Sequence, residues 1–101
     1  MALRVREALA DDAAAIGVVA AAAWRDTYAG LLAGATIEAF VEAAYSTERL
    51  LDRIAHDVVL IVEDDRGLVA FADALPEADR LTLLALYADP KRRGQGGGTL
   101  L

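Results

Sequence analysis

The stretch LTLLALYADPKRRGQGGGTLL, residues 81–101, contains the features that decide the fold. Leu81 to Tyr87 has the aliphatic content of a strand, and Pro90 and three cations separate it from glycines at positions 94, 96, 97 and 98. Glycine has no side chain to bury, and it costs about 1 kcal/mol inside a helix relative to alanine. The sequence therefore predicts a strand, then a loop whose backbone approaches a ligand, then the start of a helix.

The expected ligand of this loop is a phosphate. A glycine-rich turn leading into a helix presents backbone N–H groups and the positive end of the helix dipole. Residues 1–89 carry seven cations and sixteen acids, whereas residues 90–101 carry three cations and no acid. Lys91, Arg92 and Arg93 are predicted to add charge-assisted contacts to the same anion.

The spacing of the glycines separates three phosphate-binding patterns. The P-loop pattern G-x-x-x-x-G-K-[ST] fails because no lysine follows the glycines. The dinucleotide pattern G-x-G-x-x-G fits Gly94 and Gly96 but then meets Thr99. The third pattern, [Q/R]-x-x-G-x-[G/A], is satisfied by Arg93, Gly96 and Gly98.

Upstream of this stretch the sequence predicts three further strands. Residues 58–62, VVLIV, form a continuous apolar run typical of a strand covered on both faces. A turn over residues 64–67 joins it to a strand over residues 68–75, which Pro76 to Asp79 are expected to end. Residues 3–6 alternate apolar and polar side chains and predict a first strand.

Helical spacing fills the segment between the first and second strands. Asp11 and Asp12 are expected to cap a first helix, with Gly30 near its end, and Thr36 is expected to cap a second. Residues 46–56 predict a shorter third piece that ends on Arg53 and His56. The side chains predicted to face inward are Ile16, Val19, Ala20, Ala23, Trp24, Ile37, Phe40, Val41, Ala44, Tyr45, Leu50, Leu51 and Ile54.

Composition excludes several classes of function. The 101 residues fit one domain, and the absence of cysteine together with a single histidine disfavours a metal site. The net charge of −6 disfavours nucleic-acid binding, and the chain has neither a membrane-length apolar run nor a secretory signal. The expected compartment is the cytoplasm.

Over its whole length the chain resembles the GCN5-related N-acetyltransferase (GNAT) superfamily. The resemblance rests on RGQGGG, on LYADP before it, on AWRDTYAGLL at residues 23–32, and on the order β-α-α-β-β-β. It implies an α/β (α+β) acyl-CoA N-acyltransferase fold with a mixed, mostly antiparallel sheet. It also implies acetyl-CoA as co-substrate, without a metal, and transfer of the acetyl group to a primary amine of a small molecule or protein.

The resemblance also implies which residues bind the cofactor. The backbone of Leu86, Tyr87 and Ala88 would contact the pantetheine arm. The pyrophosphate would lie on the loop formed by Arg93, Gly94, Gln95, Gly96, Gly97, Gly98 and Thr99. The family places acceptor-binding residues near Trp24 and Tyr28, although core or inter-helix packing is the simpler interpretation of that pair.

Catalytic residues are not assigned by the sequence. Many family members carry a general-base glutamate where this chain has Thr82, and threonine cannot act as that base. Glu77 and Asp79 are the nearest carboxylates in sequence, and a solvated surface position is the simpler interpretation of both. Tyr45 is predicted to be a core residue, and His56 a helix-end residue and not a base.

Family domains reach about 140 to 150 residues, so residues 1–101 are interpreted as a single domain, incomplete at its C-terminus, that stops before the fifth strand. We then expect an uncovered apolar face around Val59 and Ile61, which self-association as a homodimer would bury. Two alternatives to the enzyme remain open. One is a fragment that binds CoA without turnover, and the other is a structural or dimerising module.

Overall fold

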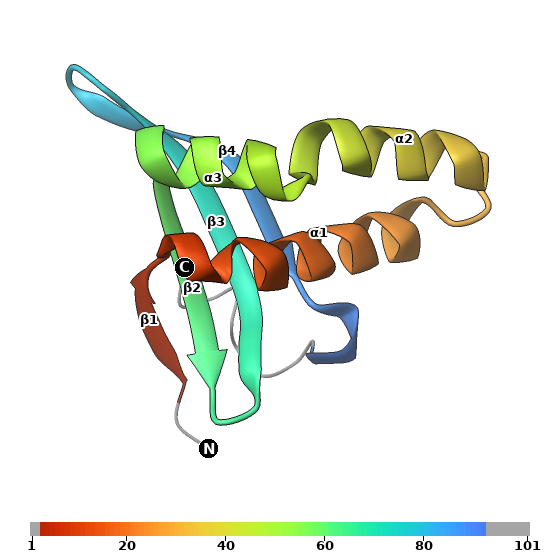
Figure 1. Cartoon of the computed structure of the whole chain (residues 1–101), viewed down its shortest axis with the longest axis horizontal. Coiled ribbons are helices and arrows are strands. Elements are labelled where there is room, and N and C mark those ends of the chain that lie inside the picture. The colour runs from red at the N-terminus through yellow and green to blue at the C-terminus, as the bar shows by residue number, and fades with distance from the viewer. Residues whose placement is uncertain (1–2, 93–101) are drawn as a thin grey trace.

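The computed structural model describes residues 3–92 and shows helices packed on one face of a sheet (Figure 1). The element order confirms the predicted sequence of one strand, the helices and three further strands. The elements are β1 (Arg4–Glu7), η1 (Ala10–Asp12), α1 (Ala13–Tyr28), α2 (Gly34–Tyr45), α3 (Thr47–His56), β2 (Val58–Asp64), β3 (Gly67–Glu77), β4 (Arg80–Ala88) and η2 (Pro90–Arg92). Within the described residues, no helix has both the length and the apolar character needed to cross a bilayer.

The four described strands form one antiparallel sheet in the order β1-β2-β3-β4. The predicted β2–β3 hairpin is confirmed, and Gly67 ends its turn with φ of +119°, a conformation that glycine adopts without strain. The prediction that Pro76 ends β3 is wrong, because β3 continues to Glu77. Proline is tolerated there because β2 pairs with β3 only as far as Ala74, so one edge of β3 has no neighbouring strand at Pro76.

The main core lies between α1 and the sheet. Ile16, Val19 and Ala20 are buried on α1 as predicted, and they pack with Ile61 and Phe71 of the two central strands. Leu50 is also buried, which brings α3 onto the same core. The helical periodicity therefore predicted correctly which face of α1 covers the sheet.

Two residues predicted to face inward are exposed. Phe40 is 43% exposed and Leu51 41% exposed. Phe40 stacks on Trp24 at the outer end of α1 and α2, with 4.0 Å between ring centroids, and does not reach the sheet. Helical spacing alone does not distinguish a contact between helices from a contact with the sheet.

The predicted helix caps are corrected as well. α2 begins at Gly34, so Thr36 lies inside the helix and is not its N-cap. Asp12 precedes α1 but makes no side-chain cap, because its carboxylate accepts hydrogen bonds from the Arg6 guanidinium and from the Leu9 N–H. The Arg6 hydrogen bonds lower the pKa of Asp12 and keep this pair charged.

The apolar exposed face is not the predicted one. Val59 and Ile61 are buried, because they face the helices. Residues directly opposite each other in paired strands share a face, and the register places Leu86 beside Ala72 and Leu83 beside Ala74, on the face away from the helices. Leu86 is 46% and Leu83 60% exposed on that face. The uncovered apolar surface is thus centred on β4.

Candidate functional site

Leu86, Tyr87 and Ala88, the predicted pantetheine-binding residues, are the last three residues of β4. In the part of the chain that the structure describes, β4 pairs with β3 alone, so its other edge carries backbone N–H and C=O groups that no described strand uses. Such an edge can accept an extended ligand through main-chain hydrogen bonds.

A β-bulge interrupts β4 just before these three residues. Ala85 pairs with Asp73 and Leu83 with Ala74, so Leu84 is an extra residue in the strand. A bulge bends a strand and leaves the extra residue outside the regular ladder. The backbone of β4 at Leu84 is therefore less completely paired than a regular strand would be, close to the predicted cofactor contacts.

The chain leaves β4 through a well-fixed turn. The Asp89 N–H donates to the Val69 carbonyl at 2.8 Å, and the Asp89 carboxylate accepts the Lys91 N–H at 3.0 Å. The Arg92 N–H donates to the Asp89 carbonyl at 2.9 Å and closes η2. These bonds fix the turn from β4 up to Arg92, the last described residue.

Arg92 does not have its predicted role. Its guanidinium donates to the buried carboxylate of Asp64 at the end of β2, and this bond lowers the pKa of Asp64. Arg92 thus ties η2 to the sheet, and its charge is neutralised within the protein. The predicted pyrophosphate-binding residues lie outside the described residues, so their role stays a prediction; they are Arg93, Gly94, Gln95, Gly96, Gly97, Gly98 and Thr99.

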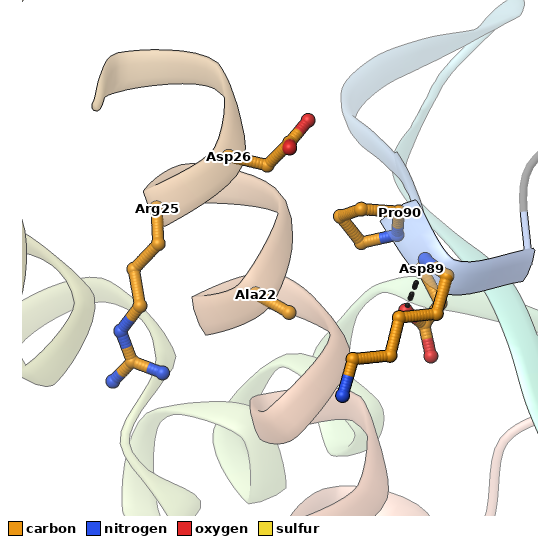
Figure 2. Close-up of a pocket in the computed structure, with 6 residues that line it drawn as sticks. Ala22, Arg25, Asp26, Asp89 and Pro90 are labelled. Carbon is orange, nitrogen blue, oxygen red and sulfur yellow. Dashed lines mark hydrogen bonds between the residues drawn. The ribbon is translucent and has the colours of Figure 1, made fainter. Parts of the chain in front are cut away.

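A pocket of about 540 Å³ lies between α1 and η2. Figure 2 shows Asp26 and Ala22 of α1 opposite Pro90, while the side chain of Arg25 extends away from Pro90. Arg25 instead forms a two-point ion pair with Glu38 of α2, at 2.6 and 2.8 Å. The pocket adjoins the end of β4, and its lining also includes Asp89 and Lys91.

Three aromatic rings of α1 and α2, those of Trp24, Tyr28 and Phe40, pack together and form an aromatic wall. Trp24, one of the two weakly predicted acceptor-binding residues, stacks on Phe40, and its centroid lies 4.4 Å from that of Tyr28, the other predicted residue. Tyr45 is 7% exposed and contacts the rings of Phe71 and Tyr87, which confirms its prediction as a core residue.

The wall is hydrogen-bonded to β4. The Trp24 indole N–H donates to the Tyr87 hydroxyl at 2.8 Å, and the Tyr45 hydroxyl lies 3.3 Å from the same oxygen. Burial raises the pKa of Tyr45, and its hydrogen bond to Tyr87 adds to the effect, so Tyr45 stays protonated at neutral pH. The side chain of Tyr87, which the sequence did not orient, points toward the helices.

Thr82, which stands where the resemblance implies a general base, is hydrogen-bonded to a carboxylate. Its hydroxyl donates to Glu77 Oε1 at 2.6 Å across the β3–β4 turn. Arg80 lies 3.4 Å from the other Glu77 oxygen. Glu77 is exposed, as predicted, and its carboxylate lies beside the Thr82 hydroxyl.

A buried ion pair under α3 was missed by the sequence analysis. Asp73 of β3 is 1% exposed, and its carboxylate accepts from the Arg53 guanidinium at 2.5 Å. Arg53 also lies over the ring of Tyr45, 5.0 Å from the centroid. The signal in the sequence was an acid inside the apolar run FADAL, residues 71–75, because a charge inside a buried strand needs a partner.

The described residues contain no cluster of three or more side chains suited to hold a metal ion. His56 is the last residue of α3, as predicted, and its Nδ1 lies 2.9 Å from the Asp52 carbonyl one turn earlier. Neither observation adds a catalytic group to the site.

Comparisons with known proteins identify similar chains, although no protein-family model matches. The chain is 29% identical over 97 residues to spermidine N(1)-acetyltransferase of Thermoplasma acidophilum, covering 90% of this chain and 60% of that protein. The crystal structure of PaiA N-acetyltransferase from Thermoplasma acidophilum in complex with coenzyme A matches with a TM-score of 0.91 and 28% identity, covering 100% of this chain and 67% of the other.

A second solved structure supports the same assignment. A GCN5-related N-acetyltransferase structure from Rhodopseudomonas palustris matches with a TM-score of 0.80 and 26% identity, over 100% of this chain and 61% of that one. The chain thus spans about 60% of the length of the curated relative it matches. These similarities show the acyl-CoA N-acyltransferase fold, and the chain is similar to GCN5-related N-acetyltransferases.

Proposed function

We propose that the chain binds acetyl-CoA and takes part in transferring its acetyl group to a primary amine. The observation that carries the proposal is the bulged, open edge of β4, which continues through η2 into RGQGGG. A structure with a TM-score of 0.91 to this chain was determined with coenzyme A. The pantetheine would pair with the backbone of Leu86, Tyr87 and Ala88, and the pyrophosphate would lie on Arg93 to Thr99.

The chemistry is a direct acyl transfer. The amine nitrogen attacks the thioester carbonyl carbon, a C–N bond forms, the C–S bond breaks, and the electron pair leaves with the CoA sulfur. The amine must lose a proton for this attack, and Glu77 is the fixed carboxylate beside Thr82 that would accept it, directly or through water. The remaining rate enhancement would come from holding the amine and the thioester close together in the correct orientation.

The proposed acceptor class is a small cationic amine. Support comes from a relative named for spermidine acetylation. The pocket beside β4 is lined by two carboxylates, Asp26 and Asp89, and by two cations, Arg25 and Lys91. The amine of a protein side chain is the alternative acceptor.

The experiment is an acetyl-transfer assay of the 101-residue chain with acetyl-CoA and a panel that begins with spermidine and includes a lysine peptide. Release of CoA thiol that depends on a small amine supports the proposal. Thiol release with the peptide alone would overturn the small-amine part of it. Binding of acetyl-CoA without transfer to any amine would instead support the alternative that the chain is a CoA-binding module without turnover. The presence of Thr82 in place of a general-base glutamate favours that alternative.

A further inference from the structure

Tyr87 connects two parts of the site that lie far apart in sequence. Trp24 is 63 residues before Tyr87, and its indole N–H reaches the Tyr87 hydroxyl at 2.8 Å. The Tyr87 ring is itself held by two neighbours, Phe71 at 5.6 Å and Tyr45 at 5.7 Å between centroids. The oxygen that accepts the Trp24 hydrogen bond is therefore fixed relative to the sheet.

Trp24 in turn contacts the other two rings of the aromatic wall. Phe40 of α2 stacks on it at 4.0 Å, and Tyr28 lies one helical turn further on at 4.4 Å. Besides the Tyr87 hydroxyl, the other oxygen near the Trp24 indole N–H is the Tyr45 hydroxyl, which lies 3.3 Å from the Tyr87 hydroxyl. An indole N–H in a partly apolar environment needs an acceptor, because losing it leaves the donor unsatisfied.

We propose that Tyr87 is a positioning residue for the amine acceptor. Its hydroxyl holds the Trp24 ring, and with it Phe40 and Tyr28, in the position that forms the acceptor side of the site. This inference rests on the proposed function, because it assumes that the amine lies against this wall and the cofactor along β4. The side chain of Tyr87 would therefore affect binding of the amine through Trp24, whereas the backbone of Tyr87 would contact the cofactor.

The substitution that tests this role is Tyr87→Phe, which removes one oxygen and keeps the ring that packs on Phe71 and Tyr45. The control is Thr47→Val, which also removes one hydroxyl but at an exposed position at the start of α3, outside the proposed site. We expect Tyr87→Phe to weaken apparent affinity for spermidine about tenfold, while the dissociation constant for acetyl-CoA changes less than twofold. Thr47→Val should change the spermidine affinity less than twofold.

A spectroscopic readout separates positioning from general loss of structure. Trp24 is the sole tryptophan of the chain, so tryptophan fluorescence reports on this ring alone. Tyr87→Phe should shift the emission maximum, and spermidine added to the acetyl-CoA-saturated wild type should change the emission. In Tyr87→Phe the spermidine response should require about ten times more amine.

The outcomes distinguish the two proposals. Equal spermidine affinities for Tyr87→Phe and Thr47→Val, in samples that bind acetyl-CoA normally, would overturn the positioning role and leave the proposed function standing. A parallel loss of acetyl-CoA and spermidine affinity in Tyr87→Phe would also overturn it, because the effect would then be on the whole fold. Failure of the folded wild type to bind acetyl-CoA overturns the proposed function, and this inference with it.

Discussion

Asp73 is the residue whose environment departs most from that of an ordinary carboxylate. It is buried in β3, with Arg53 of α3 on one oxygen, and its other oxygen is buried without a hydrogen-bond partner among the described groups. Burial and the neighbouring Asp57 raise the pKa of Asp73 to about 6, against the opposing effect of Arg53. The ion pair therefore holds α3 on the sheet at an electrostatic cost.

This environment predicts a dependence of stability on pH. Because the pKa is raised on folding, the folded state binds more protons at Asp73 than the unfolded state between about pH 4 and pH 6. The contribution of Asp73 to the free energy of unfolding should be most favourable at the acid end of this window and fall as pH rises through 6, by up to about 3 kcal/mol.

The measurement is urea unfolding of wild type and Asp73→Asn at several pH values. The difference between their free energies of unfolding should shrink as pH rises from 4 to 6, since only the wild type titrates at this position. The nearby Asp57→Asn variant serves as a second comparison, and it should lower the pH of the transition. A difference that is constant across the window would show that Asp73 is not shifted.

Glu77 is the residue with the most direct bearing on catalysis. If it accepts the proton of the amine, Glu77→Gln should lower kcat/KM for spermidine about a hundredfold, within the range of general-base catalysis. The neutral change keeps the size of the side chain and an oxygen that can accept from Thr82. Asp79→Asn, in the same turn, is the control and should retain the wild-type rate. Equal rates for Glu77→Gln and wild type would show that the proton is accepted elsewhere.

Among the elements, α3 depends on a local cap for its position. The Ser46 hydroxyl accepts the Arg49 N–H at 3.3 Å and so satisfies one free donor at the start of the helix. Ser46→Ala should lower the free energy of unfolding by about 1 kcal/mol, whereas Ser46→Asp, which keeps an acceptor, should lower it by less. Thermal unfolding followed by circular dichroism measures both, and equal losses would show that the Ser46 hydroxyl does not stabilise α3.

The elements were largely predictable from the sequence, and their caps and ends were not. Apolar residues at helical spacing fixed the buried face of α1 because Ile16, Val19 and Ala20 all contact the sheet. Asp12 occupies the N-cap position of α1, as predicted, but its side chain makes no capping hydrogen bond. Thr36 was mistaken for a cap because its residue type suits that role. Asp12 instead binds Arg6, a tertiary contact that no local pattern contains. Pro76 was mistaken for a strand end for the same reason, since only the register shows that β2 no longer flanks it.

The position of the predicted pantetheine contacts could be inferred from the sequence. Leu86 to Ala88 end β4, which among the described strands pairs with β3 alone, and their contact with the cofactor stays a prediction. The hydrogen bonds of Trp24 to Tyr87 and of Thr82 to Glu77 were not predictable. The first depends on the packing of α1 across the sheet, and the second on the register of the β3–β4 turn.

At the scale of the whole molecule, the described residues form two layers, with helices on one face of the sheet (Figure 1). Leu83 and Leu86 are exposed on the other face, together with Val5, which is 45% exposed and pairs with Val62 of that face. Neighbouring exposed apolar side chains promote association, because burying them removes apolar surface from water.

Replacing both leucines by serine should therefore reduce self-association of the 101-residue chain. Sedimentation velocity of Leu83→Ser/Leu86→Ser should show a smaller associated fraction than wild type at the same concentration. The control, Val18→Ser/Leu31→Ser, changes two side chains that are 69% and 76% exposed outside the sheet, and it should leave the associated fraction unchanged. The same reduction in both variants would mean that the β4 face has no special role.

The central claim is that the backbone of β4 and of the glycine-rich stretch binds acetyl-CoA. Isothermal titration calorimetry of the folded chain with acetyl-CoA tests it directly, with Gly96→Asp as the disrupting variant. Gly34→Asp is the matched control, since Gly34 is exposed at the start of α2 with open space around it. The account predicts one site per chain, with binding retained in Gly34→Asp and lost in Gly96→Asp. Equal affinity in wild type and Gly96→Asp, or no binding by folded wild type, would contradict it.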